Sequence, residues 1–514
     1  MDDQVIAINA PLELLQEPFV QDRLCSICSK ISFRALLDGT CSDQLRREGC
    51  PESQGSCTHI KLGTLQRISS TTSYPARRLV TRCISLYYKD LPINRNIYLS
   101  CQWVADGPEM VAGREINARD DYESVFCITI LVCRHALESK FRQQRSGGPC
   151  RLTGIGAILP ARPHYRKGDF GSEISCNGSP SDGNLKIPHY AYARYVTPLI
   201  NIGLVREWIA SCTAKHHKCC ESRFPTPLTL ANIRLVDVQK RQVTLRDMSC
   251  RYIALSYVWG PSTTGLLTRA TLETFSREGS LGHEDVPRTI RDAISLVADL
   301  GERYLWIDSL CIIQDDRSDK RQYLPMMGEI YNAAMMVVVA AVENAHSGLS
   351  GRGGKKRQQS RMMETIQGID FTLGQPELWD YLPTTTWNTR GWTYQEAELS
   401  RRAIFITDSQ VYWSCCEAYW CEDRFTEFPT QPRASLVNPL FTNCRTLPGN
   451  HLKHPVLCPL GEYCQMVTEF SSRSVSDRKD ILWAFFGILK SLLSRFPRRY
   501  IWGLPKEKLD SALL

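Results

Sequence analysis

The chain has 514 residues, of which 43% are hydrophobic and 23% are charged, and its formal net charge at pH 7 is +8. These values are ordinary for a globular protein of two or more domains, and they exclude a chain that is mainly disordered. The basic residues gather mainly at 351–361, where no aromatic residues are interleaved with them, so we expect no nucleic-acid partner.

The cysteines and the start of the chain indicate a compartment. The 22 cysteines are too sparse for a disulfide scaffold, and the first residues, MDDQVIAINA, lack the apolar core of a secretory signal. The longest apolar run, Ala333–Val342, has about half of the roughly 20 residues that a membrane-spanning helix needs. We therefore expect reduced thiols, no membrane span and a cytoplasmic location.

The first half of the chain contains weakly defined elements. Residues 1–142 form a Cys-rich region, in which three apolar or β-branched segments predict strands: CISLYY, NIYLSCQW and VFCITILVC. Residues 143–187 are polar, contain Gly and Pro, and predict a linker. Residues 188–249 are predicted to lead into the next domain through one helix and two strands. These elements cover Pro198–Lys215, Ala231–Val238 and Gln242–Arg246.

From residue 250 the pattern becomes sharper, because apolar strands alternate with amphipathic helices. The predicted strands are Tyr252–Trp259, Tyr304–Ile313, Met335–Val342 and Ala403–Thr407. The predicted helices are Arg288–Leu300, Gln322–Ala334 and Trp392–Leu399. This alternation predicts an α/β domain at 250–425 with a doubly wound, mainly parallel sheet, beside a mixed α+β Cys-rich N-terminal region. Residues 426–514 predict a C-terminal helical region.

Four sequence blocks resemble the heterokaryon incompatibility (HET) domain of filamentous fungi. They are Ala254–Gly260, Leu305–Gln314, Gly328–Ala334 and Asn388–Glu396. The resemblance covers about 250–400 and implies a role in non-self recognition, in which activation triggers growth arrest and programmed cell death. It also implies self-association or a partner incompatibility protein. The ending LPKEKLDSALL resembles a point at which relatives continue, which leaves a truncated chain and a short form as alternatives.

HET domains are regarded as remotely similar to TIR domains, some of which cleave NAD. The order of motifs agrees with a TIR domain: Leu255-Ser256-Tyr257, Trp306-Ile307-Asp308, an apolar strand ending near Val342, and a helix with Trp392 and Glu396. The stretch between Val342 and Trp387 departs from a compact TIR domain and leaves the route into a pocket undefined.

Polar groups are expected to converge at one edge of the predicted sheet. Ligands of open parallel sheets bind beyond the carboxyl ends of the strands, where Ser256, Asp308 and the start of the Trp392–Leu399 helix all fall. Breaking the nicotinamide–ribose bond passes through an oxocarbenium-like state and releases a neutral base. One carboxylate that binds the ribose hydroxyls and stabilises the developing positive charge can therefore suffice. The resemblance assigns this role to Glu396.

The two acidic candidates also have structural interpretations. Glu396 is alternatively a surface carboxylate that pairs with Arg401 or Arg402, or a glutamate near the helix start that interacts with the helix dipole. Asp308 either holds a ribose hydroxyl or caps the turn that follows it.

Five further residues are candidates for binding NAD. Trp259 and Trp392 either stack on an aromatic base or belong to the core. Arg390 either contacts a phosphate or pairs with one of the two carboxylates. The resemblance adds Ser256 and Tyr257 to the same site.

Two Cys/His clusters are weighed as zinc sites. Cys25 and Cys28 form one tight pair, but a second tight pair is missing from the usual set of four ligands. The denser cluster joins a pair at helical i,i+4 spacing to two further cysteines. Its members are Cys212, His216, Cys219 and Cys220, with His217 between them. The alternative is a helix end with buried thiols, which we favour. We expect no tightly bound cofactor, with NAD entering only as a substrate.

Two functions of different classes follow from these features. The first is a death effector that hydrolyses NAD when it is assembled, and the second is a non-enzymatic module whose TIR-like surface recruits partners. A zinc-dependent nucleic-acid binder is a third, more remote interpretation.

Overall fold

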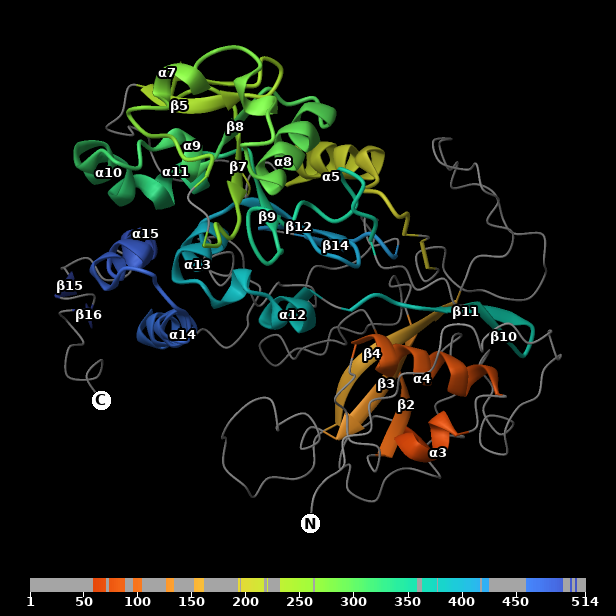
Figure 1. Ribbon diagram of the computed structural model, residues 1–514. Helices are drawn as coiled ribbons and strands as arrows, with labels where there is room; N and C mark the ends of the chain where they lie inside the picture. Colours follow the sequence, from red (N-terminus) through yellow and green to blue (C-terminus); the bar gives the residue numbers. More distant parts are fainter. Residues whose placement is uncertain are drawn as a thin grey trace. The chain divides into compact units, whose positions relative to one another are not determined.

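The computed structural model divides the chain into two compact units, each described here by itself (Figure 1). Unit 1 comprises 1–196, 359–376 and 423–435, and unit 2 comprises the remaining segments. The structure describes residues 59–70, 74–87, 96–103, 126–133, 152–160, 193–194, 196–216, 220, 232–261, 264–357, 363–376, 378–416, 418–424, 459–492, 500–501 and 504–505.

Unit 1 is built on a six-stranded antiparallel sheet in the order β1-β2-β3-β4-β11-β10. The strands are β1 (His59–Thr64), β2 (Asn96–Trp103), β3 (Phe126–Cys133), β4 (Leu152–Pro160), β10 (Met363–Ile366) and β11 (Ile369–Leu373). Two helices, α3 (Leu65–Ser69) and α4 (Pro75–Tyr87), belong to this unit. The strands predicted at NIYLSCQW and VFCITILVC are confirmed as β2 and β3.

Two predictions for unit 1 are wrong. The segment CISLYY lies mainly in α4, where Leu79, Val80 and Cys83 are buried on one face with helical spacing. The six residues of CISLYY are too few to show the helical spacing, because their apolar residues also fit a strand. The predicted linker at 143–187 contains β4, which pairs with β3 and β11 and is therefore part of the sheet.

Unit 2 is built on an eight-stranded mixed sheet in the order β14-β13-β12-β9-β7-β8-β5-β6. The strands are β5 (Asn232–Asp237), β6 (Gln242–Asp247), β7 (Ile253–Ser256), β8 (Tyr304–Trp306), β9 (Met336–Ala340), β12 (Arg402–Ile406), β13 (Val411–Cys415) and β14 (Tyr419–Cys421). The four central strands, β12, β9, β7 and β8, are parallel, and the outer strands on both sides are antiparallel. Every residue of β9 and β12 is buried, as expected for strands covered on both faces.

The order in which the chain adds parallel strands to the sheet reverses at β7. The chain passes from β7 to its neighbour β8 and then returns to β9 on the other side of β7, with β12 beyond it. Such a reversal leaves a crevice at the carboxyl ends of the two strands that flank it, where open parallel sheets bind their ligands. Ser256 ends β7 at this point.

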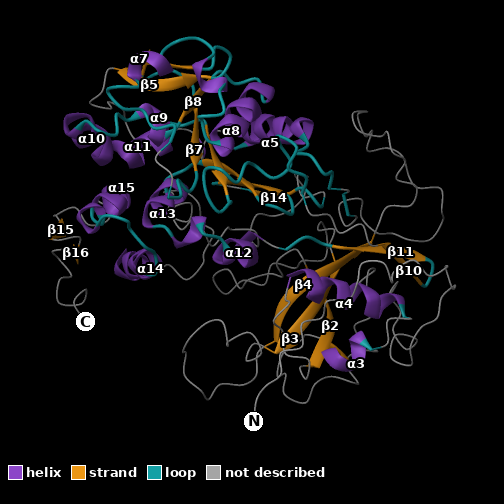
Figure 2. Cartoon of the chain, viewed as in Figure 1, coloured by secondary structure: helices purple, strands orange, loops and turns teal. Residues whose placement is uncertain are grey.

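Helices pack around this sheet (Figure 2). The α-helices are α5 (Ile202–Lys215), α7 (Leu272–Phe275), α8 (Arg288–Asp299), α9 (Asp308–Cys311), α10 (Arg317–Tyr323), α11 (Met327–Ala333), α12 (Leu378–Tyr381), α13 (Gly391–Glu398), α14 (Pro459–Ser471) and α15 (Trp483–Leu492). Short 3-10 turns are η5 (Ser280–Gly282), η6 (Leu324–Met326), η7 (Leu382–Thr384), η8 (Trp387–Thr389) and η10 (Arg478–Asp480), and a small ladder joins β15 (Tyr500–Ile501) to β16 (Leu504–Pro505). Among the described residues, no helix combines the length and the apolar character needed to cross a membrane.

Most elements predicted for unit 2 are confirmed, and two are corrected. The strand predicted at Tyr304–Ile313 ends at Trp306, because Asp308 accepts a hydrogen bond from the Ser309 backbone N–H at 2.7 Å and the chain turns into α9. The single helix predicted at Gln322–Ala334 is broken into α10, η6 and α11 at Pro325, whose missing N–H cannot continue a helix.

The C-terminal helix α15 packs closely on α11 through two glycines. A Cβ atom added to Gly487 would lie 2.9 Å from the Gly328 Cα and 2.7 Å from the Leu399 Cδ1. The Gly487 N–H also donates to the Gln395 Oε1 at 2.6 Å, which ties α15 to α13. Packing of the C-terminal helix therefore requires both glycines, and it fixes the helix that carries Glu396.

Replacing Gly487 by Ala should lower the free energy of unfolding by about 1–3 kcal/mol, because the added methyl group forces α15 away from α11. Chemical denaturation followed by circular dichroism would measure this. Gly203→Ala is the matched control, since Gly203 is an exposed helical glycine whose added Cβ would meet only the Asn201 Oδ1, at 3.4 Å. This control should keep or raise stability, by up to about 1 kcal/mol. Equal stability of Gly487→Ala and wild type would contradict the close packing.

Candidate functional site

The carboxyl group of Glu396 is buried at the carboxyl end of β7. The Ser256 hydroxyl donates a hydrogen bond to the Glu396 Oε2 and itself accepts one from the Trp387 Nε1–H at 2.8 Å. The Tyr331 hydroxyl lies within hydrogen-bonding reach of the same carboxyl group and is 3.0 Å from the Leu255 carbonyl oxygen, to which it donates. Glu396 is only 4% exposed, so this acid sits inside the protein rather than on the helix surface.

The start of α13 positions this carboxyl group. The helix begins at Gly391, where an added Cβ would lie 2.6 Å from the Val475 side chain, so a larger residue does not fit. The Gly391 N–H donates to the Ser474 carbonyl at 2.8 Å, and the Thr393 hydroxyl donates to the Trp387 carbonyl at 2.6 Å. The helix start is thus fixed by its neighbours on both sides.

Asp308 forms an outer, half-buried part of the same edge. Its Oδ2 accepts from the Trp259 Nε1–H at 2.8 Å, and its Oδ1 accepts from the Ser309 backbone N–H at 2.7 Å. The Tyr257 hydroxyl donates to the Ser309 hydroxyl at 2.7 Å, which joins the end of β7 to the turn after β8. Asp308 therefore does stabilise the turn that follows it, while its other oxygen faces an indole.

The two acids influence each other electrostatically. Burial raises the pKa of Glu396 to about 8, and the nearby charge of Asp308 adds to this increase, whereas Ser256 and Arg390 oppose it. Burial also raises the pKa of Asp308 to about 6, against the effects of its hydrogen-bond donors and Arg390. At neutral pH, Glu396 is therefore mostly protonated and Asp308 mostly ionised. Glu396 is bonded to the end of β7 and Asp308 follows β8, so both acids belong to the carboxyl ends of neighbouring parallel strands.

Arg390 and Trp392 lie at the margin of this group of residues. Both are half-buried, and Trp392 and Trp259 pack against the hydrophobic core. The Arg390 charge acts on both carboxyl groups, yet its guanidinium donates no hydrogen bond to any residue that the structure describes. These donors are consequently available to a ligand.

The alternative pairing of Glu396 with Arg401 or Arg402 is wrong. The Arg401 guanidinium donates to backbone carbonyls, including the Asn332 oxygen at 2.7 Å. The Arg402 Nε–H donates to the Cys212 sulfur at 3.2 Å. The interpretation as a first-turn glutamate also fails, because Glu396 lies in the second turn of α13.

Three partners of the site were missed in the sequence: Trp387, Tyr331 and Ser309. Trp387 lies one residue before the block that contains Glu396, and Tyr331 lies within GEIYNAA, so their positions beside recognised motifs were the available signal. Only the fold shows that the Trp387 indole and the Tyr331 hydroxyl reach the end of β7.

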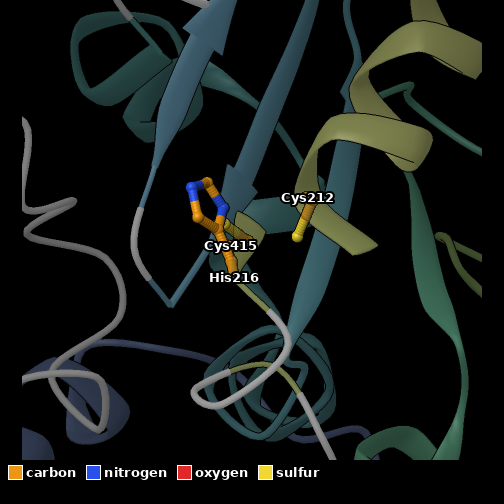
Figure 3. A group of neighbouring side chains, drawn as sticks. All are labelled: Cys212, His216 and Cys415. Carbon is orange, nitrogen blue, oxygen red and sulfur yellow. The ribbon is translucent and has the colours of Figure 1, made fainter. Parts of the chain in front are cut away.

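Only some of the cysteines and histidines considered as zinc ligands lie among the described residues. Cys25, Cys28 and Cys219 lie outside the described residues. Cys212 and His216 are buried near the end of α5 and lie beside Cys415, at the end of β13 (Figure 3). Cys220 is buried as well. Cys311, in α9, is buried with its pKa raised to about 12, which fits an inert thiol.

Comparison with known proteins identifies the segment that contains the two acids. The family described as "Heterokaryon incompatibility protein (HET)" matches residues 252–396. The protein named "Heterokaryon incompatibility protein 6, OR allele", from Neurospora crassa, is 31% identical over 129 residues, which cover 21% of this chain and 18% of that relative. The match thus spans less than a fifth of the relative's length. No solved structure matches the chain.

Replacing Glu396 by Gln should make the protein relatively more stable as the pH rises. A folded-state pKa near 8, above the ordinary value of 4.5, means that wild type binds a proton on folding. Its stabilising effect is complete below about pH 4.5 and is lost as the pH rises through 8. Between pH 5 and 9, the difference in unfolding free energy between Glu396→Gln and wild type should rise by an amount on the order of a few kcal/mol.

Urea denaturation at several pH values would measure this difference, with Glu207→Gln on the exposed side of α5 controlling for the loss of a surface carboxyl group. A difference that stays constant with pH would show that Glu396 is not a buried, protonated acid.

Proposed function

Because this chain belongs to the fungal heterokaryon incompatibility (HET) domain proteins, we propose that it acts in non-self recognition as an effector of cell death. We further propose that its α/β core is TIR-like and doubly wound, and that it cleaves NAD at the nicotinamide–ribose bond when assembled. The order of the four parallel strands supports this core, since it is the 2-1-3-4 succession of flavodoxin-like sheets.

One observation carries the enzymatic proposal. Two carboxyl groups from distant parts of the sequence, Asp308 and Glu396, lie at the carboxyl ends of the strands where the strand order reverses, and both have raised pKa values. Acids perturbed by burial and by each other are concentrated at functional sites, because structural positions more often use neutral or fully paired groups. The family match from 252 to 396 includes both acids.

The reaction needs little acid catalysis. The bond between ribose C1′ and the pyridinium nitrogen breaks, and its electron pair neutralises the nicotinamide. The sugar is left as an oxocarbenium ion, to which the oxygen of a water molecule adds while a carboxylate takes the proton of that water. An ionised Glu396 stabilises this cation, and Asp308 adds a second negative charge close by.

In this mechanism, Glu396 loses its proton when NAD binds. In this structure the acid is mostly protonated at neutral pH because it is buried with Asp308 nearby. The positively charged pyridinium of NAD would lower its pKa on entering the site, since an opposite charge favours the ionised form. Arg390, whose guanidinium donors are available, would bind the diphosphate, and Trp259 and Trp392 would stack on the bases.

Access to Glu396 requires movement in this mechanism. The acid is 4% exposed, and its hydrogen bond to Ser256, which also holds Trp387, closes the site. We assign the open form to the assembled protein, because α13 also packs on α14 and α15 and can transmit to Glu396 a contact made on those helices. The closed form then represents the silent state that a death effector needs.

The same burial supports a second candidate function. An acid that is covered and hydrogen-bonded to Ser256 also serves to lock α13 onto β7 without any chemistry. In that case the core is a non-enzymatic module that recruits partners through its surface.

Purified, concentrated wild-type protein should release nicotinamide from NAD, and Glu396→Gln should reduce the rate by about 100-fold or more. Chromatographic detection of nicotinamide would measure this, with light scattering to establish assembly. Glu398→Gln is the matched control, because Glu398 is also buried in α13 but interacts with Tyr394, whereas Glu396 is the acid bonded to Ser256. Intact NAD after incubation with folded, oligomeric wild type would overturn the enzymatic mechanism.

Expression in fungal cells would separate the two functions. For an NAD-cleaving effector, Glu396→Gln should abolish growth arrest, while the variant remains folded and assembles. For a recruiting module, growth arrest should survive Glu396→Gln at the wild-type level. Absence of growth arrest with wild type, even when the protein is assembled, would contradict the role in cell death itself.

A further inference from the structure

A second group of chemically capable side chains lies at the opposite end of the parallel strands from Glu396, near the start of β12. The ligand atoms of Cys212, His216 and Cys415 all lie within 4.8 Å of one another, and all three residues are buried. Figure 3 shows that they come from the last turn of α5, the residue after this helix and the end of β13. Residues 203 positions apart in sequence are thus brought together by the fold.

Cys220 lies next to this group of three. Backbone hydrogen bonds of 2.9 Å join His216 N–H to the Cys212 carbonyl and Cys220 N–H to the His216 carbonyl, so the three side chains follow at helical intervals. The Cys220 thiol is fully buried and exchanges hydrogen bonds with Cys212 and Cys415. The Cys220 sulfur therefore lies next to the three ligand atoms and offers a fourth ligand to an ion bound by them.

The spacing fits a tetrahedral ion. Zinc bonds of about 2.3 Å to sulfur and about 2.0 Å to nitrogen place neighbouring sulfur and nitrogen ligands about 3.5 Å apart. The Cys415 sulfur lies 3.4 Å from the His216 Nδ1. Soft thiolates combined with an imidazole are the donors that select zinc over magnesium or calcium.

A buried positive charge lies beside the group. The buried Arg402 donates from its Nε–H to the Cys212 sulfur at 3.2 Å, and it lies opposite Cys415 in the β12–β13 ladder. A buried guanidinium needs a negative partner. Three thiolates with one Zn²⁺ carry a net charge of about −1, which Arg402 neutralises.

Aromatic rings enclose the group. The Trp420 ring lies 5.8 Å from the His216 ring and 6.3 Å from the Trp208 ring, and both tryptophans are buried. Structural zinc sites have four protein ligands and no open position, whereas catalytic sites keep one position for water or substrate. The enclosure fits a structural site.

We propose that Cys212, His216, Cys220 and Cys415 bind one structural zinc ion, which fastens the end of α5 to the strand β13. Cys416 also interacts with Cys220. It is not assigned to the ion, because its sulfur donates to the Arg401 carbonyl at 3.7 Å and it is partly exposed. The ion joins the helix α5 to β13, the strand next to the edge strand β14 in unit 2, so its loss should loosen both elements together.

Metal analysis of the full chain tests the proposal. Wild type, produced with zinc and purified without chelator, should lose one equivalent of zinc on Cys415→Ser substitution and the same on Cys212→Ser substitution. Cys311→Ala is the matched control, since Cys311 is equally buried in unit 2 but lies outside the group, and it should keep the full zinc content. The midpoint of thermal unfolding should fall with chelator in wild type and Cys311→Ala.

Spectroscopy decides the outcome if the serine variants fail to fold. In a Cys25→Ser, Cys28→Ser background, X-ray absorption at the zinc edge should report three sulfur ligands and one nitrogen ligand, and cobalt exchange should give the visible bands of a tetrahedral thiolate site. Folded protein of that background without bound zinc would overturn the proposal. So would a disulfide between Cys212 and Cys220 or Cys415, detected by mass spectrometry of protein alkylated under native conditions.

Discussion

A carboxyl group that is buried away from water must either have a charged partner or keep its proton. In this protein the buried carboxyl group is that of Glu396, and the hydrogen bond from Ser256 holds it in place. The bond joins β7, at the centre of the sheet, to α13. Trp387 donates to the same hydroxyl, so strand, helix and the preceding turn share one oxygen. No cationic side chain donates to Glu396 among the described residues, and the acid therefore depends on its proton. This arrangement is stable while the site is closed and becomes unfavourable once the acid ionises.

The fold was predictable where a single segment carries its own signal. Met336–Ala340 is continuously apolar and β-branched, and it is the central strand that this pattern indicates. The helix at Arg288–Asp299 buries Ile290, Ile294 and Val297 on one face, as its periodicity predicts. The prediction failed where a short window fits two periods, as in CISLYY. It also failed for the helix predicted at Gln322–Ala334, because Pro325 interrupts the helical pattern.

The candidate site was predictable only in outline. The rule for parallel sheets predicts that Asp308 and Glu396 lie at the same edge, and their electrostatic coupling agrees with this. The burial of Glu396 could not be read from the sequence, because it depends on Trp387 and Tyr331, whose side chains reach the acid only after α11 and the segment before α13 have packed on β7. The cluster of Cys212, His216 and Cys415 was also only partly predictable from the sequence. Cys212 and His216 reveal a local spacing, but Cys415 joins them through the ladder that pairs β13 with β12.

The segment that the family match covers is smaller than the unit that must fold. Residues 252–396 include β7, β8 and β9 but end before β12, the parallel neighbour of β9. Without β12, β9 would expose a row of unpaired backbone groups and a set of apolar side chains that are now buried. The strand β12 in turn pairs with β13, and Arg402 at its start donates to the sulfur of Cys212 on α5. The helix before the matched segment and the strands after it therefore belong to the same physical core. A fragment limited to 252–396 would lack the contacts that bury β9, so the acid and its neighbours need the longer chain of unit 2 to hold their positions.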